Sequence, residues 1–184
     1  MPDEVRPDDD EYYETRLELL SQGDIFRDVP LAYPSPAREI VEEESAAGRR
    51  FLSGPFETGL AMLTTPTCSM RSQTDPSAYA NPVRTLVPVM PLDDGLKRSL
   101  GLDAAKLGLL RKYDRLINYM YLPAAPAYGL PESLVFLYMP VTLHHDLIDG
   151  QQLALQGARQ LHRKLVWFAS GLLLPRETFE PPMD

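Results

Sequence analysis

Apolar runs that stop at prolines constrain the fold of this chain more than any other feature. Three of them are "GLAMLTTP", "VRTLVPVMP" and "ESLVFLYMP", and the 184 residues contain 18 prolines in all. None of these runs reaches the roughly 18 residues that a membrane-spanning helix needs. Proline lacks the N–H that a β-ladder uses, so it ends a strand or confines it to a sheet edge. The pattern therefore predicts several short strands separated by turns, as in a small barrel.

The apolar runs also give the expected positions of the strands. Residues 133–142 are the most apolar and are expected to form a central strand. Residues 83–90 are rich in valine, but the prolines in this run, Pro88 and Pro91, indicate an edge strand or an early end. Further strands are predicted at residues 24–31, 50–53, 57–65 and 117–121.

Apolar residues recur at helical spacing in two longer segments, residues 102–116 and residues 158–172. A short helix is also expected within residues 11–20, where Tyr13, Leu17 and Leu20 share one side. The order along the chain is strands, a helix, more strands and a closing helix. This order predicts an α+β fold, with a small barrel and with inserted and C-terminal helices.

Charge is distributed unevenly along the chain. Residues 1–44 hold 14 acidic and 4 basic residues, and residues 45–184 hold 12 acidic and 14 basic residues. We therefore expect an acidic, partly disordered arm at residues 1–20, a single domain at 21–175 and an irregular tail at 176–184. The polar segment "SPAREIVEEESAAGRR" is expected to be a charged surface insertion or a short helix.

Several classes of protein are disfavoured by composition and motifs. One cysteine cannot form an internal disulfide or a cysteine-based zinc site, and the acidic N-terminus does not resemble a signal peptide. No phosphate-binding glycine motif and no HExxH spacing occurs, so neither a cofactor nor a metal site is expected. The nearly neutral body does not favour nucleic acid. We expect a cytoplasmic protein without membrane insertion.

Cys68 is the only cysteine and lies between hydroxyl side chains in "TTPTCSM". A nucleophilic cysteine needs a lowered pKa and a base within reach, and His144, His145 and His162 are the candidates. A free cysteine is also among the most often buried residues, and burial beyond the strand end is the favoured interpretation. If this segment does chemistry, the hydroxyls of Thr64 and Thr65 are the better candidates.

The segment "TLHHDLID" holds the densest group of functional side chains. On a strand, His144 and Asp146 would face one side and His145 the other. A histidine beside a carboxylate can orient a base or contribute to a metal site. Histidines and aspartates at the end of a strand are equally typical of ordinary turns. The cluster therefore stays a weak catalytic candidate.

The closing helix carries the candidate binding residues. Its basic side chains could contact phosphate or a partner, although solvated basic faces are common. Its aromatic pair is more typical of a core or an interface than of a base-stacking platform. The candidate binding residues are Arg159, Arg163, Lys164 and Trp167.

The order of "QGDIF", "GLAMLTTPTC" and "VRTLVPVMPL" over residues 22–92 resembles the MazF/PemK-like toxins. The resemblance implies a bacterial protein with an SH3-like barrel, and it implies RNA cleavage by an arginine and a hydroxyl. Arg50 and either Thr64 or Thr65 are the nearest counterparts here. The chain departs from the family because the loop after the first strand is acidic and has no Arg-Pro step. Fold likeness alone does not carry the activity.

Together these features favour a non-catalytic interaction or assembly protein built on a small SH3-like barrel. No recognisable catalytic set is present, and a protein partner or a homo-oligomer is expected. The first alternative is a MazF-like endoribonuclease for single-stranded RNA, with Arg50, Thr64, Thr65 and His144 in its site. The second is a cysteine- or histidine-based hydrolase that uses Cys68 with His144 or His145.

Overall fold

The fold is mixed helix and sheet, and it is seen in a computed structural model of the chain. The described residues are 13–15, 18–31, 41–44, 50–53, 57–72, 74–75, 79–113, 116, 118–148, 150–158, 161–162 and 164–166. Among them, no helix is long and apolar enough to cross a bilayer.

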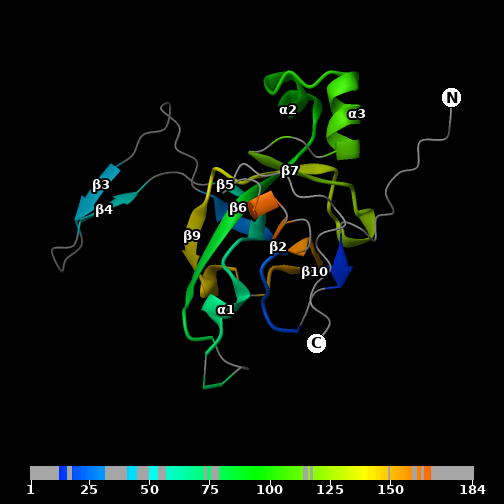
Figure 1. Cartoon of the computed structure of the whole chain (residues 1–184). Coiled ribbons are helices and arrows are strands. Elements are labelled where there is room, and N and C mark those ends of the chain that lie inside the picture. The colour runs from blue at the N-terminus through cyan, green and yellow to red at the C-terminus, as the bar shows by residue number, and fades with distance from the viewer. Residues whose placement is uncertain are drawn as a thin grey trace.

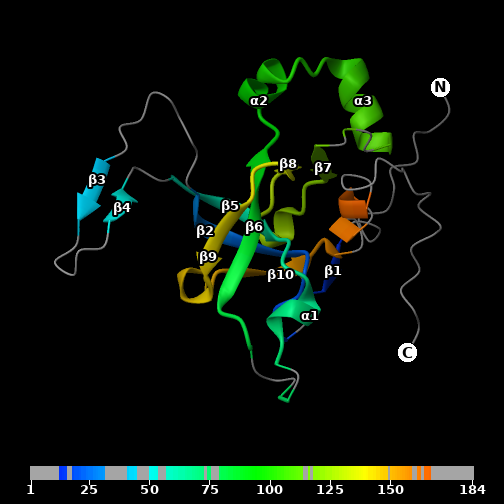
Figure 2. The same ribbon diagram turned by 60° about the vertical axis from the view of Figure 1, so that its left-hand side comes forward.

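An antiparallel sheet of eight strands forms the body. Its path runs β1-β10-β2-β5-β6-β8-β7, and β9 pairs with β6 off this path. The sheet curls into a half-barrel (Figures 1 and 2). The strands are β1 (Glu14–Thr15), β2 (Asp24–Leu31), β5 (Glu57–Leu63), β6 (Val83–Pro91), β7 (Tyr119–Leu122), β8 (Ser133–Phe136), β9 (Val141–His144) and β10 (Gln152–Gln156).

The curl has a local cause in β2. The register of β2 against β5 shifts between Phe26 and Val29, and Asp28 there has a φ of 54°. A bulge of this kind bends a strand and increases its twist. Residues from both ends of the sheet consequently share one core cluster, for example Leu153 of β10 and Met120 of β7.

The expectation that residues 83–90 form an edge strand is wrong. β6 lies inside the sheet, between β5 on one side and β8 and β9 on the other. Residues 83–86 pair with β9 and residues 89–91 pair with β8. Pro88 falls in the gap between these two partners, so its missing N–H interrupts no ladder on that side.

The prediction of a single central strand at residues 133–142 is also wrong. The run forms two strands, β8 and β9, which pair with different parts of β6. Between them the chain turns, and the backbone N–H of Met139 donates to the carbonyl of Phe136 at 3.2 Å. Pro140 follows the turn and cannot continue a ladder.

The helix predicted at 102–116 is found over part of that range, and a second helix that was not predicted precedes it. The structure has α2 (Asp94–Ser99) and α3 (Ala104–Tyr113), which lie together at one end of the sheet (Figure 1). Gly101 separates them with a φ of 62°, a conformation that glycine adopts without strain. The Asp103 carboxylate accepts the N–H of Lys106 at 2.8 Å and caps α3.

The remaining elements are short. Strands β3 (Val41–Glu44) and β4 (Arg50–Ser53) form a separate two-stranded sheet. The helix expected within residues 11–20 is wrong where the structure describes it, because Glu14 and Thr15 pair with β10. In the predicted closing helix, residues 158, 161–162 and 164–166 are helical. The others are α1 (Thr67–Met70), η2 (Pro126–Tyr128) and η3 (His145–Leu147).

Candidate functional site

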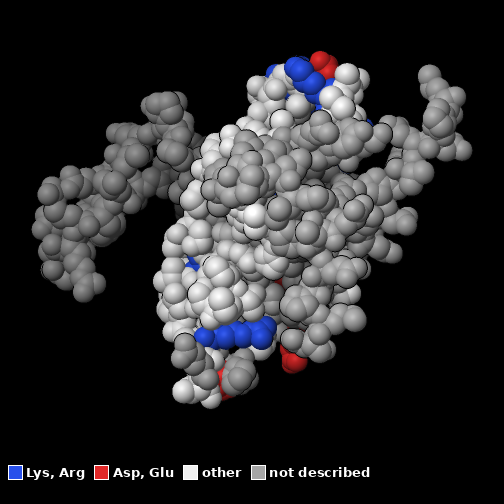
Figure 3. Space-filling view, in the orientation of Figure 1, with Lys and Arg blue, Asp and Glu red and all other residues white. Residues whose placement is uncertain are grey.

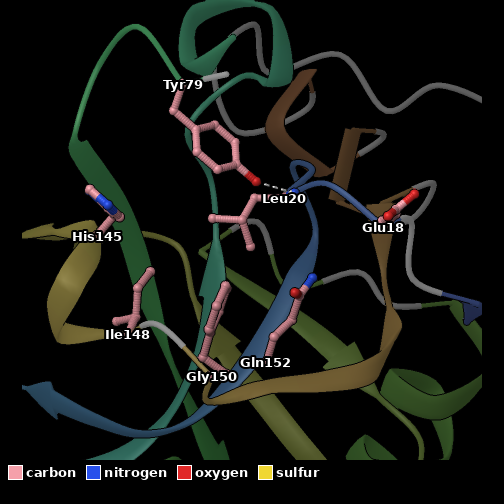
Figure 4. A pocket seen from close by; sticks show the side chains of 8 residues that line it. Glu18, Leu20, Tyr79, His145, Ile148, Gly150 and Gln152 are labelled. Atoms are coloured by element: carbon pink, nitrogen blue, oxygen red, sulfur yellow. Dashed lines mark hydrogen bonds between the residues drawn. The ribbon is translucent and has the colours of Figure 1, made fainter. Parts of the chain in front are cut away.

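A cavity of about 350 Å³ opens beside β2, β10 and the segment that follows β9. Figure 4 shows its lining, in which apolar and polar side chains from distant parts of the sequence meet. The lining exposes more polar than apolar surface to this hollow, so it has room and hydrogen-bonding groups for water or for a polar group of a ligand. The lining residues are Glu18, Leu20, Phe26, Tyr79, His145, Ile148, Gly150 and Gln152.

Tyr79 forms one wall of the cavity and is held from two directions. Its hydroxyl accepts the backbone N–H of Leu20 at 2.8 Å, as the dashed line in Figure 4 shows. The guanidinium carbon of Arg84 lies 4.9 Å from the centre of the Tyr79 ring, within the range of a cation–π contact. The ring is therefore fixed between β6 and the start of the segment that leads into β2.

Arg84 is a fully buried cation behind this wall. Its Nη1 donates to the carbonyls of Asn81 and Val83. Its Nε and Nη2 are buried without a hydrogen-bond partner, and no carboxylate pairs with it in the described part of the chain. Burial lowers the pKa of Arg84, and the neighbouring Tyr79 raises it by less. A buried charge without a counter-ion is costly, so an anion nearby would be stabilised.

Three side chains cluster at the cavity's edge, where β9 ends and η3 begins. The rings of His144 and His145 lie 4.8 Å apart at 32°, and Asp146 reaches both: Oδ2 is 3.2 Å from His144 Nδ1 and Oδ1 is 2.9 Å from His145 Nε2. The prediction that the two histidines face opposite sides is wrong. The alternation of side chains along β9 stops at His144, because η3 starts at His145. The backbone N–H of His145 donates to the carbonyl of Pro82.

The predicted hydroxyls of Thr64 and Thr65 are engaged with the backbone. Both donate to the carbonyl of Thr85, at 3.1 and 3.4 Å. Thr65 Oγ1 also accepts the N–H of Thr85 at 2.6 Å. These bonds lock the end of β5 to β6.

Gln22 extends this lock, although no motif in the sequence pointed to it. Its side-chain Nε2 donates to the carbonyl of Thr64 at 2.6 Å, and its backbone N–H donates to Thr67 Oγ1 at 2.9 Å. Its Oε1 lies 2.7 Å from His162 Nε2. His162 is therefore tied to this lock. We call Gln22, Thr64, Thr65, Thr67 and Thr85 the polar clasp.

Cys68 is exposed in α1, so its predicted burial is wrong. Pro66 turns the chain after β5 and α1 follows at once, which places the thiol on the outside of the helix. Among the described residues, none hydrogen-bonds to the thiol. A nucleophile–base pair involving Cys68 is thus not assembled in this part of the chain.

The candidate binding residues of the predicted closing helix differ in whether the structure describes them and in where they lie. Lys164 is buried and donates to the carbonyl of Leu116 at 3.0 Å, so it does not lie on a solvated basic face. Arg159, Arg163 and Trp167 lie outside the described residues, as does the side chain of Arg50 in β4. On the face in Figure 3, the described Lys and Arg residues lie over α2 and α3, at the opposite end of the molecule and in one small patch between these ends.

Tyr79 and Arg84 are the site residues that the sequence reasoning missed. Arg84 carried a usable signal, since the strand period puts it on the same face as the buried Leu86. A charged residue at an inward position of a strand is unusual and often functional. Tyr79 stood in a turn-rich segment without periodicity and carried no such signal.

Comparison of the chain with protein-family models, curated proteins and solved structures finds no match.

Proposed function

We propose that this chain is a non-catalytic interaction protein that docks onto a protein partner where β6, β9 and η3 meet. Val83 and Leu147 are 41% and 51% exposed there, and Val83 lies opposite His144 in the β6–β9 ladder. Leu147 stands between His145 and Ile148, which both line the cavity. The observation that carries the proposal is the exposure of two large apolar side chains, Val83 of β6 and Leu147 of η3, where β9 leads to the edge of the cavity. Buried apolar anchors contribute most of the binding energy in protein interfaces.

The partner is a protein that presents an acidic side chain on an apolar segment. The apolar part of that segment covers Val83 and Leu147, and the acidic group enters the cavity. Arg84 lies behind the Tyr79 wall with no counter-ion among the described residues, so its positive charge favours an acidic group in the cavity. Glu18 also borders the cavity, but it is exposed and water screens its charge.

The state of the predicted catalytic groups supports binding over catalysis. The Thr64 and Thr65 hydroxyls are engaged with Thr85, whereas an activated hydroxyl needs a base within hydrogen-bond reach. The thiol of Cys68 has no hydrogen-bonded base among the described residues. The endoribonuclease alternative needs these hydroxyls together with Arg50 and His144, and the hydrolase alternative needs this thiol together with His144 or His145.

The proposal includes an SH3-like barrel of the MazF/PemK type as the docking scaffold. It is supported by the antiparallel path from β2 through β5 and β6, which follows the order that the resemblance implies. The proposed setting is the cytoplasm, where an exposed free thiol such as Cys68 stays reduced.

Photo-crosslinking in the native host tests the docking surface. Benzoylphenylalanine replaces Leu147 in one strain and Leu109 of α3 in another. Leu109 is a matched control because it is 54% exposed on a different element. We expect a protein partner to crosslink from position 147 and not from position 109. Equal labelling from both positions, or from neither, would contradict the proposal.

The crosslinked partner is then purified and its affinity for the full chain is measured. We expect L147D to weaken binding at least about tenfold and L109D to leave it within about twofold, since central apolar contacts dominate interface energies. Replacing the acidic residue nearest the crosslink on the partner by its amide should also weaken binding about tenfold. Cleavage of single-stranded RNA by the purified chain would instead support the nuclease alternative and overturn this proposal.

A further inference from the structure

The cluster of His144, His145 and Asp146 has a geometry that a simple turn does not require. All three side chains project to one place although they are consecutive in the chain, because β9 ends at His144 and η3 begins at His145. One ligand atom from each residue can be chosen so that all lie within 4.8 Å of one another. The exposed fractions of His144 and Asp146 are 49% and 70%, so the cluster is open to ions from solvent.

His144 Nδ1 lies within reach of two groups of Asp146. The backbone N–H of Asp146 donates to His144 Nδ1 at 3.4 Å, which directs a donor at the lone pair of this nitrogen. The same nitrogen lies 3.2 Å from the Oδ2 of Asp146. An imidazole nitrogen and a carboxylate oxygen this close together are both ligand atoms that one metal cation can bind.

The spacing of the ligand atoms suits a first-row transition ion. Bonds of about 2.0–2.1 Å to imidazole nitrogen and carboxylate oxygen place neighbouring ligand atoms about 2.9 Å apart in an octahedron and about 3.3 Å apart in a tetrahedron. The observed distances are 3.2 Å from His144 Nδ1 to Oδ2 of Asp146 and 2.9 Å from His145 Nε2 to Oδ1 of the same carboxylate. Each imidazole therefore has a different oxygen beside it, and a small rotation of the exposed carboxylate presents one oxygen to both. The two imidazoles need to approach each other by at most about 1.5 Å, which rotation of half-exposed side chains allows.

From this geometry we infer that His144, His145 and Asp146 form a binding site for a divalent transition-metal ion of the zinc class. Two imidazoles with one carboxylate are ligands for Zn²⁺, Co²⁺, Ni²⁺ and Cu²⁺, whereas Mg²⁺ and Ca²⁺ prefer oxygen alone. Three protein ligands leave at least one coordination position for water or for a donor from outside the chain. The site is separate from the docking proposal, since it needs no partner to load.

The cavity supplies the surroundings that a metal-bound histidine needs. With Nε2 of His145 on the ion, the other ring nitrogen carries the proton and needs an acceptor. This atom, Nδ1, is buried without a protein partner, and His145 lines the cavity of about 350 Å³. A polar cavity of that size has room for a water that accepts the proton.

Titration of the full chain, prepared without a histidine tag, tests the site. Zn²⁺ binding is followed by calorimetry and Co²⁺ binding by its visible absorption, which reports ligand type and coordination number. We expect one ion per chain and a Co²⁺ spectrum with nitrogen and oxygen ligands. H144A, H145A and D146N should each weaken Zn²⁺ binding at least about tenfold, because each removes one of only three ligands.

His162→Ala is the matched control, because His162 is the third histidine and is exposed elsewhere, bonded to Gln22. It should leave Zn²⁺ affinity within about twofold of the wild type. The thermal unfolding midpoint of each apo variant separates lost ligands from lost fold. Folded H144A, H145A and D146N proteins that bind Zn²⁺ as tightly as the wild type would overturn the inference, as would a wild type that binds no ion at micromolar concentration.

Discussion

The polar clasp and the cavity wall lie on the same sheet but use buried polar groups in opposite ways. In the clasp, Thr65 Oγ1 accepts the N–H of Thr85 and also donates to its carbonyl. In the cavity wall, two guanidinium nitrogens of Arg84 are buried without hydrogen-bond partners. The Nδ1 of His145 is also buried without a partner. The clasp therefore contributes to stability, whereas the cavity wall lowers it.

This difference separates structural from functional polar residues more reliably than residue type does. Threonines at a strand end looked like candidate catalytic hydroxyls, but satisfied hydrogen bonds to backbone mark them as structural. A buried polar group without a hydrogen-bond partner costs about 1–3 kcal/mol of stability. Several such groups in one place are more easily explained if a ligand binds there.

The largest expected effect comes from removing the buried charge of the cavity wall. Arg84→Met keeps the length of the side chain and removes an unpaired cation, so it should raise the free energy of unfolding by about 2 kcal/mol. It should also abolish the preference of the cavity for an acidic group. Urea denaturation measures the first effect, and affinity for the crosslinked partner measures the second.

Arg111→Met is the matched control for this comparison. Arg111 donates from Nε and Nη2 to the carboxylate of Glu132, at 2.7 and 3.0 Å, so its charge has a counter-ion. Its loss should lower the free energy of unfolding by less than about 1 kcal/mol, because the pair is half-exposed. If Arg84→Met lowered the free energy of unfolding as much as Arg111→Met does, Arg84 would stabilise the fold as the residues of the polar clasp do.

A substitution in the polar clasp should change the free energy of unfolding in the opposite direction to Arg84→Met. Thr65→Val preserves the shape of the side chain but leaves the N–H of Thr85 without its acceptor, so it should lower the free energy of unfolding by about 1–2 kcal/mol. Thr142→Val in β9 makes the same change at an exposed position and should alter stability by less than about 0.5 kcal/mol. An equal effect of both changes in urea denaturation would contradict the structural role of Thr65.

Local patterns predicted the strands better than they predicted their partners. The run at residues 24–31 coincides with β2, because its apolar residues and the flanking turn residues act within the segment itself. The central place of β6 depends on β8 and β9 meeting on either side of Pro88, a long-range arrangement that no local signal encodes. The break between β8 and β9 was hidden because both halves are apolar.

The candidate site was predicted only in part, for a similar reason. The segment with His144, His145 and Asp146 was selected from residue type, and its common direction depends on where β9 gives way to η3. The cavity joins this segment to Tyr79 and Leu20, which are far apart in the chain. Sequence reasoning finds reactive side chains, whereas only the fold shows whether their hydrogen bonds are already satisfied.

Glu132 offers the smallest but most specific test of a satisfied polar group. Burial raises the pKa of its carboxyl, but hydrogen bonds from Arg111 and Tyr121 lower it by more, and the net shift is downward. Tyr121 donates to Oε1 at 2.7 Å. A carboxyl with a lowered pKa stabilises the fold above its ordinary pKa of about 4.3. That contribution is lost as the pH falls through its lowered value.

The wild type should therefore lose stability more steeply below about pH 4.5 than Glu132→Gln does. The difference should stay below about 1 kcal/mol because water screens the half-exposed pair. Arg111→Gln should flatten the same pH dependence, since Arg111 supplies the largest downward shift. Urea denaturation between pH 3 and pH 7 measures all three proteins. If Glu132→Gln flattened the pH dependence and Arg111→Gln did not, groups other than Arg111 would cause the low pKa of Glu132. Arg111 would then no longer serve as the paired control for the unpaired Arg84.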